Sequence, residues 1–301
     1  MNPLKILHPA LLRMLLFLGG GLAIAYASAC LYLLWRQNHF IFFPSANIEV
    51  TPAFFQSRYQ DVWLPVITAS GKTERIHGWW IPASGPETGV LLYLHGNGIN
   101  IGANAEQANR FQRLGFSVLL IDYRGYGRSE GEFPTEATVY QDAETAWNYL
   151  TQKRRIQPQK IFLYGHSLGG AIAINLAAQH PDAAGLMVQS SFTSMAEMAE
   201  RMGWSRYFPV NLLLTQRFNS LAKVKSLKLP VLFIHGIADN QVPFQMSQSL
   251  FNATPEPKQL LLFPGAGHNN LAEVAGSHYL QGIQTFVNQV QTRQRQLAKK
   301  S

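Results

Sequence analysis

The feature that most constrains the fold of this chain is a serine in a glycine-rich turn between an apolar strand and a helix. Residues 165–170 read Gly-His-Ser-Leu-Gly-Gly, directly after the apolar run 160–164 and directly before the helix-favouring run 171–178. The glycines on either side of the serine remove the side chains that would block so tight a turn. The hydroxyl of Ser167 is then held at a helix N-terminus, whose free N–H groups favour a nearby oxyanion. We therefore interpret this segment as a nucleophile elbow.

Two later loops supply the base and the carboxylate that a nucleophilic serine needs. Asp239 follows the apolar run 229–236, and His268 follows the apolar run 259–263. Both residues come after the carboxyl ends of predicted parallel strands, at the sheet edge where open α/β proteins place their sites. The order serine, acid, histidine is the one expected with this type of elbow. We predict a catalytic triad of Ser167, Asp239 and His268, although Asp239 could also only cap the helix that begins near Pro243.

A third loop is suited to bind a negatively charged oxygen. The apolar run 90–94 leads into His95-Gly-Asn-Gly98, a turn that resembles the loop that supplies an oxyanion-hole N–H group in esterases. We expect the backbone N–H groups of Asn97 and Leu168 to form the oxyanion hole, which does not depend on side-chain identity.

Other polar residues near these loops are interpreted as scaffold. Four of them are expected to form hydrogen bonds in turns and at strand ends: His95, Asp122, His166 and His235. Arg124 and Arg128 lie in a glycine-rich loop and are expected to pair with acids such as Glu130.

These motifs together resemble the α/β-hydrolase superfamily. The resemblance runs from Asp61 to Val290 and includes the elbow, the His95 turn, residues 122–129 (Asp-Tyr-Arg-Gly-Tyr-Gly-Arg-Ser), 235–239 (His-Gly-Ile-Ala-Asp) and 265–268 (Gly-Ala-Gly-His). With an apolar N-terminal segment, the chain looks most like the membrane-anchored bud-emergence-type (Bem-type) hydrolases. Their relatives include esterases and protein depalmitoylating thioesterases, so the resemblance implies a reaction type more firmly than a substrate.

The hydrophobic pattern independently predicts an α/β fold. Short apolar runs without polar alternation suit strands that are buried on both faces, at 90–94, 118–121, 161–164, 185–189, 231–234 and 260–263. Helical stretches separate them, at 103–114, 136–154, 168–179, 243–252 and 271–296. This alternation predicts a mostly parallel, doubly wound sheet with helices on both faces. Residues 61–66 and 75–81 are expected to form an antiparallel hairpin before it.

The first forty residues are predicted to be a membrane anchor. The segment from Met14 to Trp35 carries no charge for 22 residues, which is long enough to cross a hydrocarbon core of about 30 Å. A cleaved signal peptide, with small-residue sites near Ala27, and lipidation at Cys30 after cleavage are the alternatives. Lys5 and Arg13 precede the span and Arg36 follows it, so the positive-inside rule favours a cytoplasmic N-terminus and a catalytic domain on the non-cytoplasmic side.

Charge and cysteine content limit the classes of partner and cofactor that this chain is expected to bind. The formal net charge is +8, but residues 37–290 hold 18 basic and 17 acidic side chains, so the excess lies at the two ends. A nearly neutral domain does not favour nucleic acid as a partner. The basic tail, residues 291–301, is either solvated or in contact with anionic lipid. The single cysteine allows no intrachain disulfide, no Cys/His cluster has metal-site spacing, and triad chemistry needs no cofactor, so none is predicted.

A lid-like insertion, about residues 192–228, completes the catalytic domain predicted for residues 41–290. It is rich in methionine, leucine and aromatic residues, among them Trp204 and Phe208, which are suited either to cover an acyl chain or to form ordinary core. We predict a membrane-anchored serine hydrolase that cleaves a carboxylic ester or thioester, with a small or acylated, lipid-like substrate. A serine peptidase and a non-catalytic, membrane-tethered binding protein are the alternatives, because the fold alone does not separate these functions.

Overall fold

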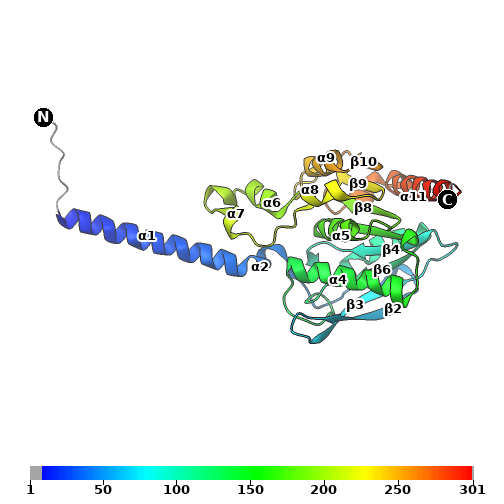
Figure 1. Ribbon diagram of the computed structural model, residues 1–301, viewed down its shortest axis with the longest axis horizontal. Helices are drawn as coiled ribbons and strands as arrows, with labels where there is room; N and C mark the ends of the chain where they lie inside the picture. The colour runs from blue at the N-terminus through cyan, green and yellow to red at the C-terminus, as the bar shows by residue number, and fades with distance from the viewer. Residues whose placement is uncertain (1–8, 300–301) are drawn as a thin grey trace.

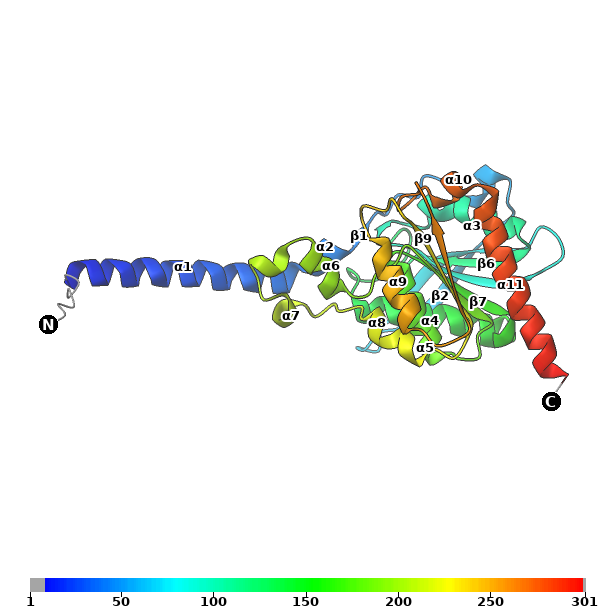
Figure 2. The same cartoon turned by 90° about the horizontal axis from the view of Figure 1, so that it is seen from above.

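A computed structural model describes residues 9–299, which form an α/β body and one long helix that projects from it (Figure 1). Residues 1–8 of the predicted anchor and residues 300–301 of the predicted tail lie outside this range. The projecting helix, α1 (Pro9–Arg36), has no buried residue, and its length and hydropathy are sufficient to cross a membrane. The C-terminal helix ends on the opposite side of the body from α1, as both views show (Figures 1 and 2). The basic tail therefore points away from α1.

An eight-stranded sheet, in the order β10-β9-β8-β7-β4-β6-β3-β2, forms the centre of the body. Six neighbouring strands from β10 to β6 are parallel, while β2 and β3 run antiparallel as a hairpin at one edge. The strands are β2 (Gln60–Ile67), β3 (Thr73–Ile81), β4 (Gly89–Leu94), β6 (Phe116–Ile121), β7 (Ile161–His166), β8 (Gly185–Gln189), β9 (Val231–Gly236) and β10 (Lys258–Phe263). The central strands are buried along their whole length because helices cover both faces.

Two hydrophobic clusters, one on each face of the sheet, hold the layers together. Side chains of α4, α5 and α9 belong to one cluster, and side chains of α3, α10 and α11 belong to the other. These helices are α3 (Ala105–Arg113), α4 (Glu136–Asn148), α5 (Leu168–Gln179), α9 (Phe244–Ala253), α10 (Leu271–Ala275) and α11 (Ser277–Ala298). The predicted α/β fold with a mostly parallel sheet is therefore confirmed. The predicted helix 271–296 is in fact two helices, because Gly276 at φ 55° interrupts it.

The lid-like insertion and the segment after α1 lie together at the end of the body from which α1 projects (Figures 1 and 2). The insertion contains α6 (Met195–Arg201), α7 (Val210–Leu213) and α8 (Ser220–Lys223). The segment contains α2 (Asn38–Ile41) and the short strand β1 (Phe43–Pro44), which pairs with β5 (Gly98–Ile99) in a separate parallel ladder.

Candidate active site

Ser167 sits at a strained turn between β7 and α5, as the sequence predicts. Its backbone has φ 54° and ψ −120°, a conformation that a residue with a side chain rarely adopts. A Cβ atom on Gly165 would lie 2.2 Å from the carbonyl oxygen of Gly169, and one on Gly169 would lie 2.0 Å from that of Leu94. Only glycine fits at both positions, so the glycines of the motif make the turn sterically possible.

Asp239 and His268 meet in a buried hydrogen bond beyond the ends of β9 and β10. His268 Nδ1 lies 2.7 Å from Asp239 Oδ2, and both residues are 8% exposed. Asp239 Oδ1 accepts hydrogen bonds from the backbone N–H groups of Gln241 and Val242, each at 2.9 Å. Both N–H groups precede α9, which begins at Phe244 without a side-chain cap, so Asp239 orders its own loop and does not cap that helix. The same carboxylate holds the His268 imidazole, as the predicted triad requires.

His235 is a partner of Asp239 that the sequence analysis assigned only to the scaffold. Its Nε2 lies 3.1 Å from Asp239 Oδ2 and 2.9 Å from the Val242 carbonyl oxygen, while its Nδ1 lies 2.6 Å from Ser247 Oγ. Burial opposes the ionisation of Asp239, but hydrogen bonds from His235 and His268 outweigh it and lower the pKa of Asp239 well below its usual range. The carboxylate is therefore charged wherever the protein is folded near neutral pH. The sequence signal for this contact was the spacing, because Asp239 follows the strand-end His235 by four residues.

His166, next to the serine, also contacts the His268 loop. Its Nε2 lies 3.2 Å from the His268 carbonyl oxygen, and the two rings are 5.1 Å apart. Burial, together with the nearby His268, lowers the pKa of His166 to about 3. A neutral His166 adds no positive charge beside His268, so Asp239 is the charged partner of that imidazole.

Ser167 and His268 line one polar cavity of about 410 Å³. The Asn97 turn, α3 and the start of α10 complete its walls. Within residues 9–299, the Ser167 hydroxyl has no hydrogen-bond partner, and neither the Asn97 nor the Leu168 N–H group donates a hydrogen bond. Catalytic hydrogen bonds are often long without substrate, so the free hydroxyl is compatible with proton transfer to His268. The free N–H groups are available to an oxyanion.

The Asn97 turn is held in place by the segment that follows α1. Phe43 N donates to the Asn97 carbonyl oxygen at 2.9 Å, and Asn97 Nδ2 donates to the Ile41 carbonyl oxygen at 2.9 Å. Tyr126 contributes a third bond, from its hydroxyl to the Asn97 carbonyl oxygen at 2.7 Å. The end of the projecting helix and the candidate oxyanion loop are therefore connected directly.

Comparison with known proteins shows which family this chain belongs to. Residues 85–222 match the family described as Serine aminopeptidase, S33. The uncharacterized protein Rv2307c of Mycobacterium tuberculosis is 35% identical over 87% of this chain and 92% of its own length. Alpha/beta hydrolase domain-containing protein 17B of Homo sapiens is 31% identical over 78% of each chain. The chain belongs to the α/β-hydrolase superfamily.

Solved structures of α/β hydrolases share the fold at lower identity. The esterase Pf2001 of Pyrococcus furiosus superposes with a TM-score of 0.68 at 19% identity, over 83% of this chain and 97% of the esterase. An α/β hydrolase of Vibrio vulnificus gives a TM-score of 0.61 at 25% identity, over 76% of this chain and 82% of its own. At this level of identity the likeness concerns the fold of this hydrolase and not its substrate.

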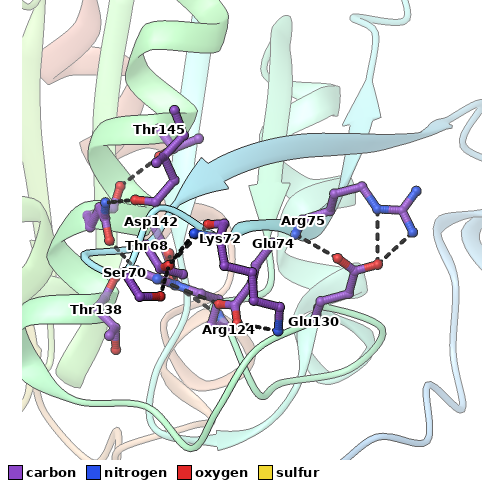
Figure 3. A network of polar contacts seen from close by, with 12 residues as sticks. Thr68, Ser70, Lys72, Glu74, Arg75, Arg124, Glu130, Thr138, Asp142 and Thr145 are labelled. Carbon is purple, nitrogen blue, oxygen red and sulfur yellow. Dashed lines mark hydrogen bonds and ion pairs between the residues drawn. The ribbon is translucent and has the colours of Figure 1, made fainter.

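The two arginines of the glycine-rich loop pair with acids in this hydrolase, as expected, but not with Glu130. Arg124 Nε lies 2.7 Å from Asp142 on α4, and its Nη1 lies 3.8 Å from Glu74 on β3. Arg128 pairs with Asp61. Glu130 pairs instead with Arg75 (Figure 3). Pairing with acids is therefore confirmed for both arginines, but the acids are Asp142 of α4 and two residues of the β2–β3 hairpin, and Glu130 is not among them. His95 and Asp122 are buried 3.4 Å apart and make the expected turn hydrogen bonds, His95 Nδ1 with the Gly96 carbonyl oxygen and Asp122 Oδ1 with Ile101 N.

Trp204 and Phe208 do not line the cavity that holds Ser167. They line a second cavity of about 290 Å³, whose other walls come from α2, α6, α7 and the end of α1. The insertion of this hydrolase thus faces the projecting helix.

Proposed function

We propose that this α/β hydrolase is a membrane-anchored serine hydrolase that cleaves a carboxylic ester or thioester. The observation that carries the proposal is the combination of a strained Ser167, a buried His268–Asp239 pair and two free N–H groups around one cavity. The esterases among the structural neighbours and the human relative are compatible with this reaction class. Assignment to the Bem-type subgroup is part of the same proposal.

The proposed reaction follows serine hydrolase chemistry. His268 takes the proton of Ser167, whose oxygen attacks the substrate carbonyl carbon, and the N–H groups of Asn97 and Leu168 stabilise the tetrahedral oxyanion. Asp239 holds the imidazole in the required tautomer and stabilises its cation. The leaving alcohol or thiol departs with the proton from His268, and water activated by the same histidine then hydrolyses the acyl-enzyme.

Membrane anchoring by α1 is the second part of the proposal. A helix of 28 residues with no buried side chain needs an apolar surrounding, and a bilayer supplies one. We expect the protein to stay with the membrane fraction at high salt and at alkaline pH and to be released by detergent. The catalytic domain is proposed to lie on the non-cytoplasmic side.

Hydrolysis of p-nitrophenyl esters of graded acyl length by the detergent-solubilised protein tests the reaction class. We expect turnover that Ser167→Ala abolishes and that Asp239→Asn lowers by about 10⁴-fold in kcat, because asparagine would favour the wrong tautomer of His268. A change in acyl-length preference in Trp204→Ala or Phe208→Ala would support an acyl substrate. Wild-type protein that is folded but hydrolyses none of these esters would contradict the proposal.

A peptidase is the second candidate, because the matching family is described as a serine aminopeptidase. Aminoacyl p-nitroanilides, measured beside the esters, separate the two reactions. Turnover of the anilides at a kcat/KM equal to or above that of the esters would favour the peptidase.

A further inference from the structure

The insertion extends along α1 well beyond the point where that helix leaves the body. The Phe208 ring stacks on Tyr26 with the ring centroids 6.0 Å apart and the planes at 8°. Tyr26 precedes Arg36 by ten residues, so Phe208 lies about 15 Å along the helix axis from its end. Both views show α6 and α7 beside the C-terminal part of α1 and away from the sheet (Figures 1 and 2). The insertion therefore occupies the same depth as part of the predicted span.

Polar contacts fix the insertion to the end of α1. Gln37 Oε1 accepts a hydrogen bond from Thr215 N at 2.8 Å, and Gln37 Nε2 lies 3.4 Å from the Leu213 carbonyl oxygen. Next to them, the Trp204 and Phe40 rings lie 5.8 Å apart. These contacts define where the insertion stands relative to the helix.

Between Met202 and Leu214 the insertion exposes several large apolar side chains, whereas α6 before this segment carries the exposed charges of Glu200 and Arg201. Met202, Tyr207 and Leu212 are 72%, 70% and 80% exposed, and Arg206 is the single charged residue between Met202 and Leu214. Large side chains exposed to this degree on a common segment are unfavourable in water. An arginine in such a segment can extend its charge to the lipid headgroups while its stem stays in apolar surroundings. This composition is typical of a segment that lies in a membrane interface.

The cavity between the insertion and α1 is apolar as well. All of its lining residues except Gln37 are apolar, and they come from α1, α2, β1 and the insertion. Phe43 is part of this lining, and its ladder partner Gly98 lines the cavity that holds Ser167. The β1–β5 ladder is thus a common wall of the two cavities.

We propose that the segment of the insertion from Met202 to Leu214 is embedded in the leaflet nearer to the α/β body, so that lipid acyl chains cover its outer face and fill the cavity beside α1. The inference rests on the membrane anchoring proposed above. It gives the protein two membrane contacts, one spanning and one interfacial, and it places the apolar cavity where hydrocarbon chains reach it from the bilayer.

Depth-dependent fluorescence quenching tests this arrangement on the full-length protein. In a Cys30→Ser background, single cysteines are introduced as Tyr207→Cys or Leu212→Cys, labelled with an environment-sensitive NBD probe and reconstituted in phosphatidylcholine vesicles with or without doxyl-labelled lipid. Leu22→Cys on α1 is the control within the span, and Gln245→Cys, on the exposed side of α9, is the control in water. Ester turnover of each labelled variant verifies its fold.

We expect the probes at positions 207 and 212 to be quenched to within about twofold of the probe at position 22, with the probe at 245 unquenched. Quenching at 22 combined with water-like behaviour at 207 and 212 would overturn the inference and leave the membrane anchor intact. Absence of quenching at 22 as well would overturn both the anchor and the inference.

Discussion

At the scale of single residues, the site depends on atoms that have no room to move. Gly169 lies against the backbone of β4, where a Cβ atom would come within 2.0 Å of the Leu94 carbonyl oxygen. Backbone cannot yield as the end of a side chain can, so any larger residue must displace the turn that presents Ser167. The glycine is therefore a structural requirement of the nucleophile.

Gly169→Ala tests this requirement. We expect the variant to lose about 1–3 kcal/mol of unfolding free energy, or to misfold, and to lose ester turnover. Gly85→Ala is the matched control, because nothing lies within 4 Å of a Cβ atom there and its φ is not positive. Urea unfolding of both variants measures the difference. Equal stability of the two would show that the elbow tolerates a side chain.

His166 makes the stability of the domain depend on pH. The pKa of His166 is lowered to about 3, whereas a histidine in an unfolded chain has a pKa of about 6.5. Between these values the unfolded chain binds the additional proton, so the free energy of unfolding falls as the pH is lowered through this window. Glutamine has no such proton equilibrium.

We therefore expect His166→Gln to lose less stability than wild type between about pH 6.5 and pH 4. Urea unfolding at several pH values gives the comparison. A difference between the two proteins that stays constant with pH would contradict the account of His166 as a buried neutral imidazole.

At the scale of elements, two connections join segments that are far apart in the sequence. The first joins the β2–β3 hairpin to α4 through Arg124, whose guanidinium is 5% exposed and pairs with the fully buried Asp142 (Figure 3). Loss of one partner leaves the other charge buried without compensation. The second is the β1–β5 ladder, which joins the end of α1 to the Asn97 turn.

Asp142→Asn tests the first connection. We expect it to cost about 3–5 kcal/mol of unfolding free energy, because the buried Arg124 then keeps only the more distant Glu74 as a charged partner. Glu130→Gln, in the exposed pair with Arg75, should change stability little. Denaturant unfolding of the two variants gives the comparison. Equal losses of unfolding free energy would contradict the account.

Asn97→Ala tests the second connection. It removes the hydrogen bond to the Ile41 carbonyl oxygen but keeps the backbone N–H group proposed for the oxyanion hole. We expect kcat for a small ester to fall by up to about 10²-fold with little change in KM or melting temperature, because the displaced N–H group stabilises the transition state less. Tyr126→Phe, which loses a bond to the same turn, should shift kcat in the same direction. An unchanged kcat in both variants would show that these side-chain bonds at the Asn97 turn do not affect catalysis.

At the scale of the whole molecule, the features set by local sequence patterns could be predicted, whereas the contacts between distant segments could not. The elbow, the parallel strands and the loops of Asp239 and His268 could be predicted because each depends on a few adjacent residues. The contact of His235 with Asp239 depends on how the chain turns after β9, and the Arg124 pairs depend on the hairpin that docks nearby.

The position of the insertion could not be predicted at all. Its contacts with α1, such as Tyr26 with Phe208, join residues that are far apart in the sequence and involve apolar side chains without a distinctive pattern. The same methionine and aromatic residues would be equally suited to cover Ser167 or to pack against α1. Tertiary packing against α1 decided between these positions.

The central claim is that Ser167 is an activated nucleophile. Labelling of the full-length protein in vesicles with a fluorophosphonate probe, followed by identification of the modified peptide by mass spectrometry, tests it directly. The account predicts one modified residue, Ser167, and no labelling of the Ser167→Ala variant. Folded wild-type protein that remains unlabelled, or a variant that labels as wild type does, would contradict it.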